Sequence, residues 1–294
     1  MTHPLVRLGR LLRESQYKFT TITPESHARV NARAGSERAR SLRDVFGWSR
    51  PFDDAVLPDE MVKLLEEAGA IDEQRRSKVR FSTDGDLLFV HSAFPTATAN
   101  SVFFGPDTYR YLRLLRERHP HAKRAVDVGC GSGAGGIAIA RDCQRVVLAD
   151  INDLALEYAA VNVALNEVTN AEIVKSDVLR DVGGAFDLVI SNPPYLIDDD
   201  HRVYRDGGGT FGEGLSIEIV RQAMQRLTRP GRLLVYTASA IVDGSDTFRI
   251  AIEPLASGFD YEEIDPDVFG SELCRPAYAS VDRIAVVALD VRLS

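Results

Sequence analysis

Apolar residues recur at helical spacing in the first hundred residues of the chain. The leucines between positions 5 and 12 lie on one face of a predicted first helix. A second helical stretch is predicted over about 24–45, because Thr23 and Pro24 suit an N-cap and a first helical turn. A third is predicted over 58–69, which Pro58 opens and Gly69 closes with a left-handed cap. The front of the chain is therefore predicted to be mainly helical.

Near residue 80 the helical pattern gives way to two short strand patterns. Residues 78–82 and 86–91 are rich in strand-forming side chains, and Thr83-Asp84-Gly85 between them is typical of a tight turn. These runs predict a β-hairpin, and helices followed by a hairpin resemble a winged-helix arrangement. We therefore interpret residues 1–100 as a smaller N-terminal domain that recognises a substrate or a partner.

From residue 101 onwards, short runs of Val, Ile, Leu and Ala alternate with helical stretches. This alternation is typical of a parallel sheet with helices on its faces. Strands are predicted near 124–128, 145–149, 171–175, 186–191, 231–237, 259–264 and 281–289. The predicted fold class is therefore α/β, with a seven-stranded, mostly parallel sheet flanked by helices over residues 101–294.

Charge is distributed unevenly between the two parts of the chain. The net charge of the whole chain is -8, but residues 1–125 carry 21 Lys and Arg against 16 Asp and Glu, whereas residues 126–294 carry 14 against 27. Arginine is concentrated at positions 29, 33, 38, 40, 43 and 50. This concentration indicates either contact with an anionic partner such as RNA or simply a solvated helix face.

No stretch of the sequence predicts a membrane span or a metal centre. The longest apolar runs, such as 137–140, are far shorter than the ~18 residues that a membrane-spanning helix needs. Charges interrupt every apolar stretch near the start, so no secretory signal is predicted and a cytoplasmic protein is expected. Cys130, Cys143 and Cys274 lack the close pairs or His partners of metal sites, so neither a metal nor a disulfide framework is expected.

A glycine-dense turn joins the first predicted strand of the sheet to a helix at residues 125–141. Gly129, Gly131 and Gly133 would let a ligand lie against the backbone near the helix N-terminus, and Cys130 lies inside the same loop. Dinucleotide-binding enzymes use the same device, and the spacing Gly131-x-Gly133-x-x-Gly136 fits them as well. The loop therefore predicts a cofactor site without deciding the class of cofactor.

Three aspartates follow three successive predicted strands, at the edge of the sheet where ligands of open α/β folds bind. Asp127 suits a cationic ligand, reached through water, or braces the loop backbone. Asp150 lies about 20 residues beyond the loop, where an acid accepts both hydroxyls of a ribose. Asp177 can accept from an adenine amine while Val178 packs on the ring, and Ile151 is placed in the same site. The set predicts an adenosine-containing cofactor.

The fourth strand of the sheet leads directly into Asn192-Pro193-Pro194-Tyr195. Two prolines supply no N–H and fix the backbone, so carbonyl oxygens are left as acceptors. An amide or aryl amine is a poor nucleophile, and accepting both N–H hydrogens, one at the Asn192 side chain, localises its lone pair. Tyr195 can stack on a flat acceptor group, and Asn192 is also placed beside the cofactor. The tetrapeptide predicts methylation of a planar nitrogen; the alternative is a strand-end turn without chemistry.

These motifs together resemble class I S-adenosylmethionine-dependent methyltransferases of the amino-methylating branch, over residues about 102–290. Within that branch the chain is most similar to the release-factor glutamine methyltransferases, which the stretches 103–109 and 206–215 also resemble. The resemblance implies a Rossmann-like fold, S-adenosyl-L-methionine held by the glycine loop and Asp150, and an acceptor held by residues 192–195. The chain departs from that family in lacking a Glu-rich strand end near 234–237 and an Arg-Pro-Glu-Thr pattern near 104–106.

The acceptor is left open between two macromolecules. The leading hypothesis is a glutamine side chain of a translation-related protein; the alternative is an adenine or guanine amine in RNA or DNA. A nucleotide-binding oxidoreductase and a catalytically silent binding module are the other classes considered. Residues 198–200 are interpreted as a solvated loop, and the glycines at 207–209 as part of a lid over the acceptor site. The oligomeric state is not predicted.

Overall fold

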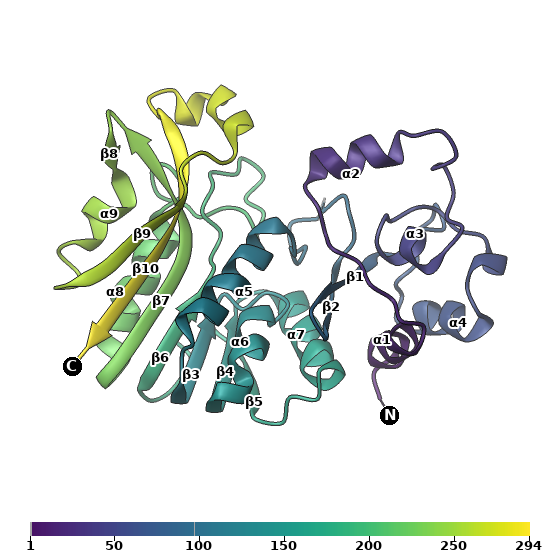
Figure 1. Cartoon of the computed structure of the whole chain (residues 1–294), viewed down its shortest axis with the longest axis horizontal. Coiled ribbons are helices and arrows are strands. Elements are labelled where there is room, and N and C mark those ends of the chain that lie inside the picture. Colours follow the sequence, from purple (N-terminus) through teal and green to yellow (C-terminus); the bar gives the residue numbers. More distant parts are fainter. Residues whose placement is uncertain (1, 97) are drawn as a thin grey trace.

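A large twisted sheet, with a helical N-terminal region at one side, dominates the computed structural model, which describes residues 2–96 and 98–294 (Figure 1). Its strands, in spatial order, are β5 (Ala171–Lys175), β4 (Cys143–Asp150), β3 (Ala122–Val128), β6 (Phe186–Ser191), β7 (Leu227–Val242), β10 (Arg283–Leu293) and β9 (Phe259–Asp265). The first five are mutually parallel, whereas β10 runs antiparallel to both β7 and β9. The predicted α/β class with a mostly parallel sheet is confirmed.

The sheet has one strand more than the seven predicted. β8 (Ser245–Asp246) is a two-residue strand that pairs antiparallel with the end of β7. Asp243 and Gly244 both adopt positive φ and turn the chain back on itself there. A strand of two residues shows no hydrophobic periodicity, which is why the pattern along the chain did not reveal it.

Helices cover both faces of the sheet. On one face lie α5 (Pro106–Arg118), α6 (Ala134–Ile139) and α7 (Asp153–Leu165), and on the other α8 (Gly214–Arg226) and α9 (Thr247–Ile252). Successive strand residues point to opposite faces, so Val146 packs under the first set and Val147 under the second. Parallel strands buried on both faces need apolar residues at nearly every position, which explains the short Val/Ile/Leu runs.

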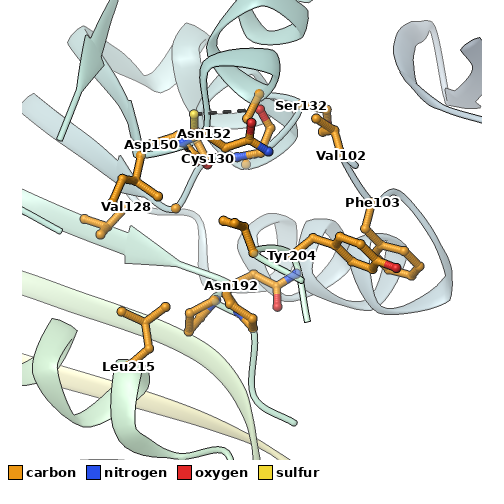
Figure 2. A pocket seen from close by; sticks show the side chains of 18 of the residues that line it. Val102, Phe103, Val128, Cys130, Ser132, Asp150, Asn152, Asn192, Tyr204 and Leu215 are labelled. Atoms are coloured by element: carbon orange, nitrogen blue, oxygen red, sulfur yellow. Dashed lines mark hydrogen bonds between the residues drawn. The ribbon is translucent and has the colours of Figure 1, made fainter. Parts of the chain in front are cut away.

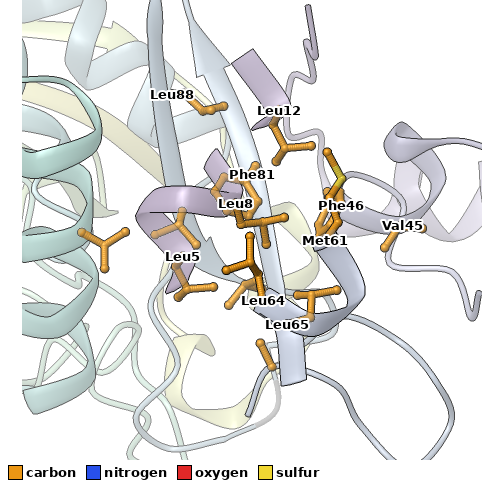
Figure 3. Packing of buried hydrophobic residues seen from close by; sticks show 14 of the residues in the cluster. Leu5, Leu8, Leu12, Val45, Phe46, Met61, Leu64, Leu65, Phe81 and Leu88 are labelled. Carbon is orange, nitrogen blue, oxygen red and sulfur yellow. The ribbon is translucent and has the colours of Figure 1, made fainter. Parts of the chain in front are cut away.

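Four short helices and a hairpin make up the N-terminal region. They are α1 (Pro4–Glu14), α2 (Pro24–Asn31), α3 (Leu42–Phe46), α4 (Asp59–Glu67), β1 (Val79–Asp84) and β2 (Leu87–Ser92). Single 3-10 turns lie at η1 (Asp54–Val56), η2 (Ala140–Asp142), η3 (Gly270–Cys274) and η4 (Pro276–Tyr278). Figure 3 shows Leu8, Leu12, Leu64 and Phe81 packed between α1, α4 and the hairpin. The winged-helix comparison stays a prediction.

The helix predicted over 24–45 is wrong, because the chain forms two helices separated by a loop of ten residues. Asn31 ends α2 with its side chain turned inward: its Nδ2 donates to the Trp48 carbonyl at 2.9 Å and its Oδ1 accepts from Arg50 Nε at 2.9 Å. Ser41 starts a new helix by accepting a hydrogen bond from the Asp44 N–H. Tertiary contacts of polar side chains thus override the local helical pattern.

Helix α7 packs both on the sheet and on the N-terminal region. Its residues Tyr158 and Leu165 belong to the same apolar core as α1 and the hairpin. The Asn162 side chain is fully buried and bonds both backbone groups of Val90 in β2, at 2.7 and 2.9 Å. The same side chain donates to the Ser132 carbonyl at 2.8 Å. The hairpin is therefore tied through one helix to the glycine-dense turn after β3.

No helix within residues 2–96 and 98–294 is both long enough and apolar enough to cross a membrane.

Candidate functional site

One pocket opens where β3, β4 and β6 end, and it gathers nearly all the residues that the sequence singled out. Its lining includes Asp127, Gly129, Cys130, Gly131, Asp150, Ile151, Asp177, Val178, Asn192, Pro193, Pro194 and Tyr195. Figure 2 shows Cys130, Ser132 and Asp150 on one side of the pocket, with Asn192 and Leu215 on the other. Gly133 is the exception: it is the N-cap of α6 and faces Leu148 and Ala159. Its predicted contact with a ligand stays a prediction.

The glycine loop, residues 129–133, presents bare backbone to the pocket. Gly129 and Gly131 adopt φ of +66° and +54°, and a Cβ built on either would meet nothing within 4 Å. Only glycine adopts this conformation without strain. The Cys130 side chain turns instead into the core, where burial raises the pKa of its thiol well above the ordinary value. The loop thus offers open space that a ligand can fill.

The Asp127 carboxylate bonds the backbone that follows the loop. Its Oδ2 accepts from the Gly136 N–H at 2.7 Å, at the start of α6. Burial, with a smaller contribution from the nearby charge of Asp150, raises the pKa of this carboxyl to about 7, against the lowering effect of the Gly136 bond. This bond reaches the helix that follows the loop, and a direct bond from Asp127 to the loop backbone stays a prediction. A cation entering the pocket would favour the ionised form of Asp127.

Asp150 joins two backbone segments at the end of β4. Its Oδ2 accepts from Gly131 N–H at 2.8 Å, and its Oδ1 accepts from Asn152 N–H at 2.9 Å. Burial raises the pKa of this carboxyl, against the lowering effect of those bonds. Each carboxylate oxygen has two acceptor positions, so both oxygens can still accept from a ligand. The apolar side chain of Ile151 beside it is 52% exposed and also lines the pocket.

The aspartate beyond β5 is less available to a ligand than the sequence implied. Asp177 forms an ion pair with Arg180, so its carboxylate already has a partner. Val178 adopts a φ of +56°, which is rare for a β-branched residue, and it is nearly buried while still lining the pocket. A strained backbone at a pocket wall is a feature of functional sites.

The tetrapeptide 192–195 forms the opposite wall. Among the described residues, the Asn192 side-chain amide makes no hydrogen bond, and Figure 2 shows it extending into the pocket. The preceding residue is held in place, since the Ser191 hydroxyl donates to the Val128 carbonyl at 2.7 Å. Tyr195 packs against Phe269 with ring centroids 5.9 Å apart, and burial raises the pKa of its phenol well above the ordinary value. Asn192 is thus an unengaged polar group on a rigid support.

Asp107 is a polar residue of this wall that the sequence motifs did not predict. It lies in the first turn of α5, is 7% exposed, and lines the pocket beside Tyr195. Its Oδ1 accepts from the Tyr236 hydroxyl at 3.2 Å and from Arg110 at 3.1 Å. The only signal in the sequence was its position in the 103–109 stretch. Tyr236 carried none, because it reads as an apolar strand residue.

Residues 196–212, here called the strap, cross the pocket beside the tetrapeptide. A Cβ at Gly207 would lie 2.7 Å from the Pro194 carbonyl oxygen, and one at Gly212 would lie 2.3 Å from that of Tyr195. Glycine is required at these two positions because the backbones touch. The strap therefore lies directly on the tetrapeptide, where the sequence predicted a lid.

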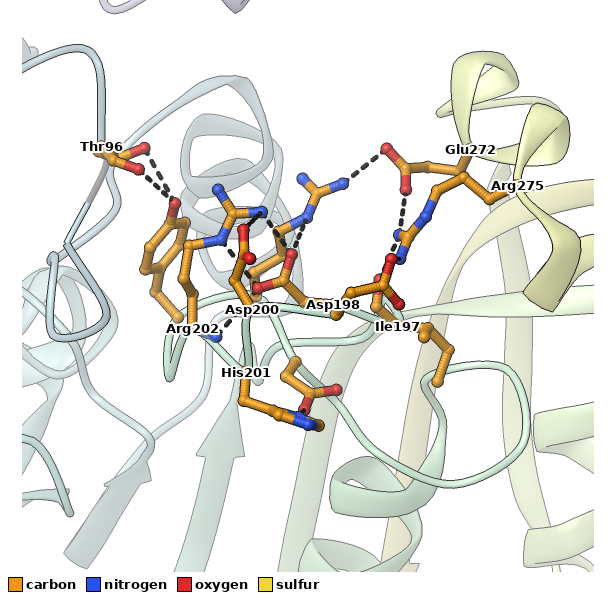
Figure 4. Close-up of polar contacts among 12 residues, drawn as sticks. Thr96, Ile197, Asp198, Asp200, His201, Arg202, Glu272 and Arg275 are labelled. Atoms are coloured by element: carbon orange, nitrogen blue, oxygen red, sulfur yellow. Dashed lines mark hydrogen bonds and ion pairs between the residues drawn. The ribbon is translucent and has the colours of Figure 1, made fainter.

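The prediction of a solvated loop at 198–200 is wrong for Asp198. This side chain is 3% exposed, and the guanidinium groups of Arg202 and Arg205 lower the pKa of its carboxyl to about 2. Arg205 also pairs with Glu272 at 2.6 Å, and Figure 4 shows the chain of ion pairs continuing to Arg275. The carboxylates are thus neutralised by arginine; within the described part of the chain, no cluster of His, Cys, Asp or Glu suits a metal ion.

Aromatic side chains frame the mouth of the pocket. Phe103 and Tyr204 lie with their rings nearly parallel, 9° apart at 6.2 Å between centroids (Figure 2). Tyr204 belongs to the strap, and its hydroxyl donates to the Thr96 carbonyl at 2.7 Å. The strap is therefore fastened to the N-terminal side of the molecule as well as to η3.

Comparison with known proteins identifies the central part of the chain. Residues 108–243 match the family model of the methyltransferase small domain. This part of the chain is similar to the methyltransferase small domain. The chain is 35% identical over 142 residues to the release factor glutamine methyltransferase of Lactococcus lactis, covering 44% of this chain and 52% of that protein. It is also 35% identical over 153 residues to the ribosomal RNA small subunit methyltransferase C of Pasteurella multocida, covering 51% of this chain and 42% of that protein.

The chain thus spans about half the length, or less, of these curated relatives. Among solved structures, the methyltransferase domain resembles M. jannaschii TYW2 in complex with AdoMet, with a TM-score of 0.50 and 15% identity over 73% of this chain and 85% of that one. It also resembles the M. jannaschii tRNA m1G37 methyltransferase, with a TM-score of 0.50 and 16% identity over 74% and 57%. At such identities the likeness shows the fold alone. The predicted Rossmann-like methyltransferase architecture is confirmed.

Proposed function

We propose that the protein is an S-adenosylmethionine-dependent N-methyltransferase that methylates a planar NH2 group. The observation that carries this proposal is a single pocket with two different walls. One wall is the bare backbone of Gly129 and Gly131 with the carboxylate of Asp150. The other is the tetrapeptide 192–195, whose Asn192 amide has no partner among the described residues. Cofactor and acceptor would therefore meet inside one cavity.

The first wall fits S-adenosylmethionine. Gly129 and Gly131 leave open space against the backbone, and Asp150 keeps two oxygens that can accept from ribose hydroxyls. Ile151 and Val178 offer apolar surface to the adenine, and Asp127 offers negative charge near the loop. When bound, this cofactor supplies a methyl group on a positively charged sulfur and leaves as the neutral thioether.

The second wall suits a flat nitrogen acceptor. The Asn192 Oδ1 and a backbone carbonyl, freed by two prolines, can accept its two N–H hydrogens and localise its lone pair. Tyr195 stays neutral and offers a ring for stacking. As the nitrogen forms its bond to the methyl carbon, the carbon–sulfur bond breaks, and the nitrogen then releases one proton. Positioning in a dry pocket supplies most of the rate enhancement.

Two acceptors carry such a group: the glutamine amide of a protein and the exocyclic amine of a nucleic-acid base. The curated relatives divide in the same way, since one is named for a release factor glutamine and the other for ribosomal RNA. The sequence favoured glutamine. The aromatic pair at the pocket mouth, of which Phe103 is 38% exposed, favours a base, because rings stack readily on nucleobases.

The test is to incubate the purified protein and methyl-tritiated S-adenosylmethionine with total RNA and, separately, with the protein fraction of a cell extract. Label in either polymer, lost on Asn192→Ala while S-adenosylhomocysteine still binds, supports the proposal. Binding of NAD in calorimetry together with no binding of S-adenosylhomocysteine would refute it.

A further inference from the structure

Most of the arginines of residues 24–50, here called the basic segment, are exposed and form no ion pair with the described residues. The segment carries six arginines against three acidic residues. Two of the arginines are neutralised, as Arg38 pairs with Asp53 and Arg50 pairs with Asp44. The other four are exposed and form no ion pair with the described residues; they are Arg29, Arg33, Arg40 and Arg43. Free guanidinium groups of this kind bind phosphate oxygens well.

The basic segment reaches the mouth of the pocket through direct contacts. The His27 ring of α2 packs edge-on against Phe94 with centroids 4.5 Å apart, and the Ser49 hydroxyl accepts from the Phe94 N–H at 3.4 Å. Two residues further along the chain, the Thr96 carbonyl accepts from Tyr204. Figure 1 shows α2 on the same side of the molecule as the loops that follow the strand ends. Helix α2 and the pocket mouth therefore lie on the same side of the molecule.

An aromatic platform of two stacked rings, Phe103 and Tyr204, lines the pocket. Phe103 is 38% exposed, stacks on Tyr204, and comes from the stretch that links the N-terminal region to α5. Val203 beside it is 41% exposed. Exposure of large apolar side chains to water at a pocket mouth is unfavourable in free energy. A flat ligand that covers these side chains would remove that cost.

We propose that the basic segment and the Phe103–Tyr204 platform form a binding surface for single-stranded RNA, with one base delivered into the pocket; this rests on the proposed function. Phosphates would contact the four free arginines, and the base next to the target would stack on Phe103. A base must leave its stack before its amine can be methylated, which a single strand allows at low cost. A duplex is disfavoured, since the catalytic half, with 27 acidic against 14 basic residues, offers no long basic groove.

Fluorescence anisotropy of a labelled single-stranded RNA oligonucleotide, with S-adenosylhomocysteine present, tests this surface. Each lost phosphate contact lowers the slope of log affinity against log salt by about 0.7 for a single strand. The double variants Arg29→Gln/Arg33→Gln and Arg40→Gln/Arg43→Gln should each lower that slope by about 1.4. The matched control is Arg10→Gln/Arg113→Gln, which removes two exposed arginines from α1 and α5 and should leave the slope unchanged.

Phe103→Ala tests the platform separately and should weaken RNA binding by about 5- to 150-fold without changing the salt slope. Binding of S-adenosylhomocysteine shows that each variant is folded. Equal slopes for the three double variants, or unchanged affinity in Phe103→Ala, would overturn the surface. So would failure of the wild-type protein to bind RNA while it binds an acidic polypeptide through the same arginines. RNA binding that needs these residues, without methylation, would support the surface and count against the proposed function alone.

Discussion

The two walls of the pocket are built in different ways. The cofactor wall consists of short-range parts: a glycine loop and three aspartates, which lie at or within two residues of the carboxyl ends of β3, β4 and β5. The acceptor wall combines the tetrapeptide with side chains from α5, β7, the strap and η3, which are far apart in the chain. The first wall presents backbone and small polar groups, whereas the second presents large side chains fixed by one another.

This difference separates the features that any protein of this fold can share from the contacts that are particular to this protein. Cofactor recognition needs only the edge of a sheet, so any chain with this fold and these few residues can supply it. Under the proposed function, acceptor recognition would depend on contacts such as Asp107 to Tyr236 and Arg205 to Glu272. Substitutions in the two walls should therefore change different measured quantities.

The largest effect is expected from Asn192→Ala. Removal of the side chain that accepts from the nucleophile should lower the methylation rate by roughly 10²-fold, as for other groups that act only in a transition state. The affinity for S-adenosylhomocysteine, measured by calorimetry, should stay the same. An unchanged rate would refute the role given to Asn192, and a loss of cofactor affinity would erase the distinction between the walls.

Asp150→Ala should have the opposite signature. Hydrogen bonds to a charged group contribute about 1.5 to 3 kcal/mol, so the affinity for S-adenosylhomocysteine should fall by roughly 10- to 150-fold. Asp177→Ala is the matched comparison and should cost less, because its carboxylate is already paired with Arg180. Equal losses of affinity in the two variants would show that Asp150 and Asp177 contribute equally to cofactor binding.

Asp107→Asn examines the acceptor wall without touching the tetrapeptide. Loss of charge weakens the bonds from Tyr236 and Arg110, and a net hydrogen bond contributes about 0.5 to 1.5 kcal/mol, so kcat/KM should fall by about 2- to 12-fold. Cofactor affinity should not change. Asp265→Asn is the control, since Asp265 pairs with the same arginine but lies outside the pocket; an equal fall there would make Asp107 a structural residue only.

The pH dependence of cofactor binding should report on Asp127. Its pKa is raised from 3.8 to about 7 by burial, so the folded protein holds a proton that the unfolded chain has released. Folding stability therefore falls as pH rises from about 4 to about 7, and above 7 the ionised carboxylate favours a cationic ligand. Affinity for S-adenosylmethionine should rise several-fold between pH 6 and 8 in wild type and stay flat in Asp127→Asn. A flat wild-type profile would contradict this.

Gly133→Ala should have the smallest effect on binding. With φ at +78°, alanine there should cost about 1 kcal/mol of stability, seen as a lower Tm, while cofactor affinity is unchanged because the residue faces the core. Gly131→Ala has a similar backbone cost but places its methyl in open pocket space. It should therefore also weaken cofactor binding; equal affinities for the two variants would contradict the distinction.

The same contrast explains how far the sequence could be interpreted. Strand ends with Asp127, Asp150 and Asp177 were predictable because a parallel sheet brings its carboxyl edges together whatever the loops do. The solvated loop at 198–200 was mispredicted because Asp198 is buried by arginines whose positions depend on the strap's path. The motif states the spacing of its glycines but not which of them faces the pocket, and Gly133 faces Leu148 and Ala159 instead. The long helix over 24–45 failed because Asn31 is engaged by Trp48 and Arg50 from beyond the helix.

The buried amide of Asn162 makes the hairpin and the cofactor loop parts of one mechanical unit. One side chain holds Val90 in β2 and Ser132 in the loop, so ordering of the loop by a ligand is transmitted to the hairpin without any domain movement. Amide hydrogen exchange in β2 should then slow when a ligand fills the pocket on the far side of α7. A chain shortened to begin at residue 101 would lose that partner and expose Tyr158 and Leu165, so we expect the two regions to unfold together in a single transition.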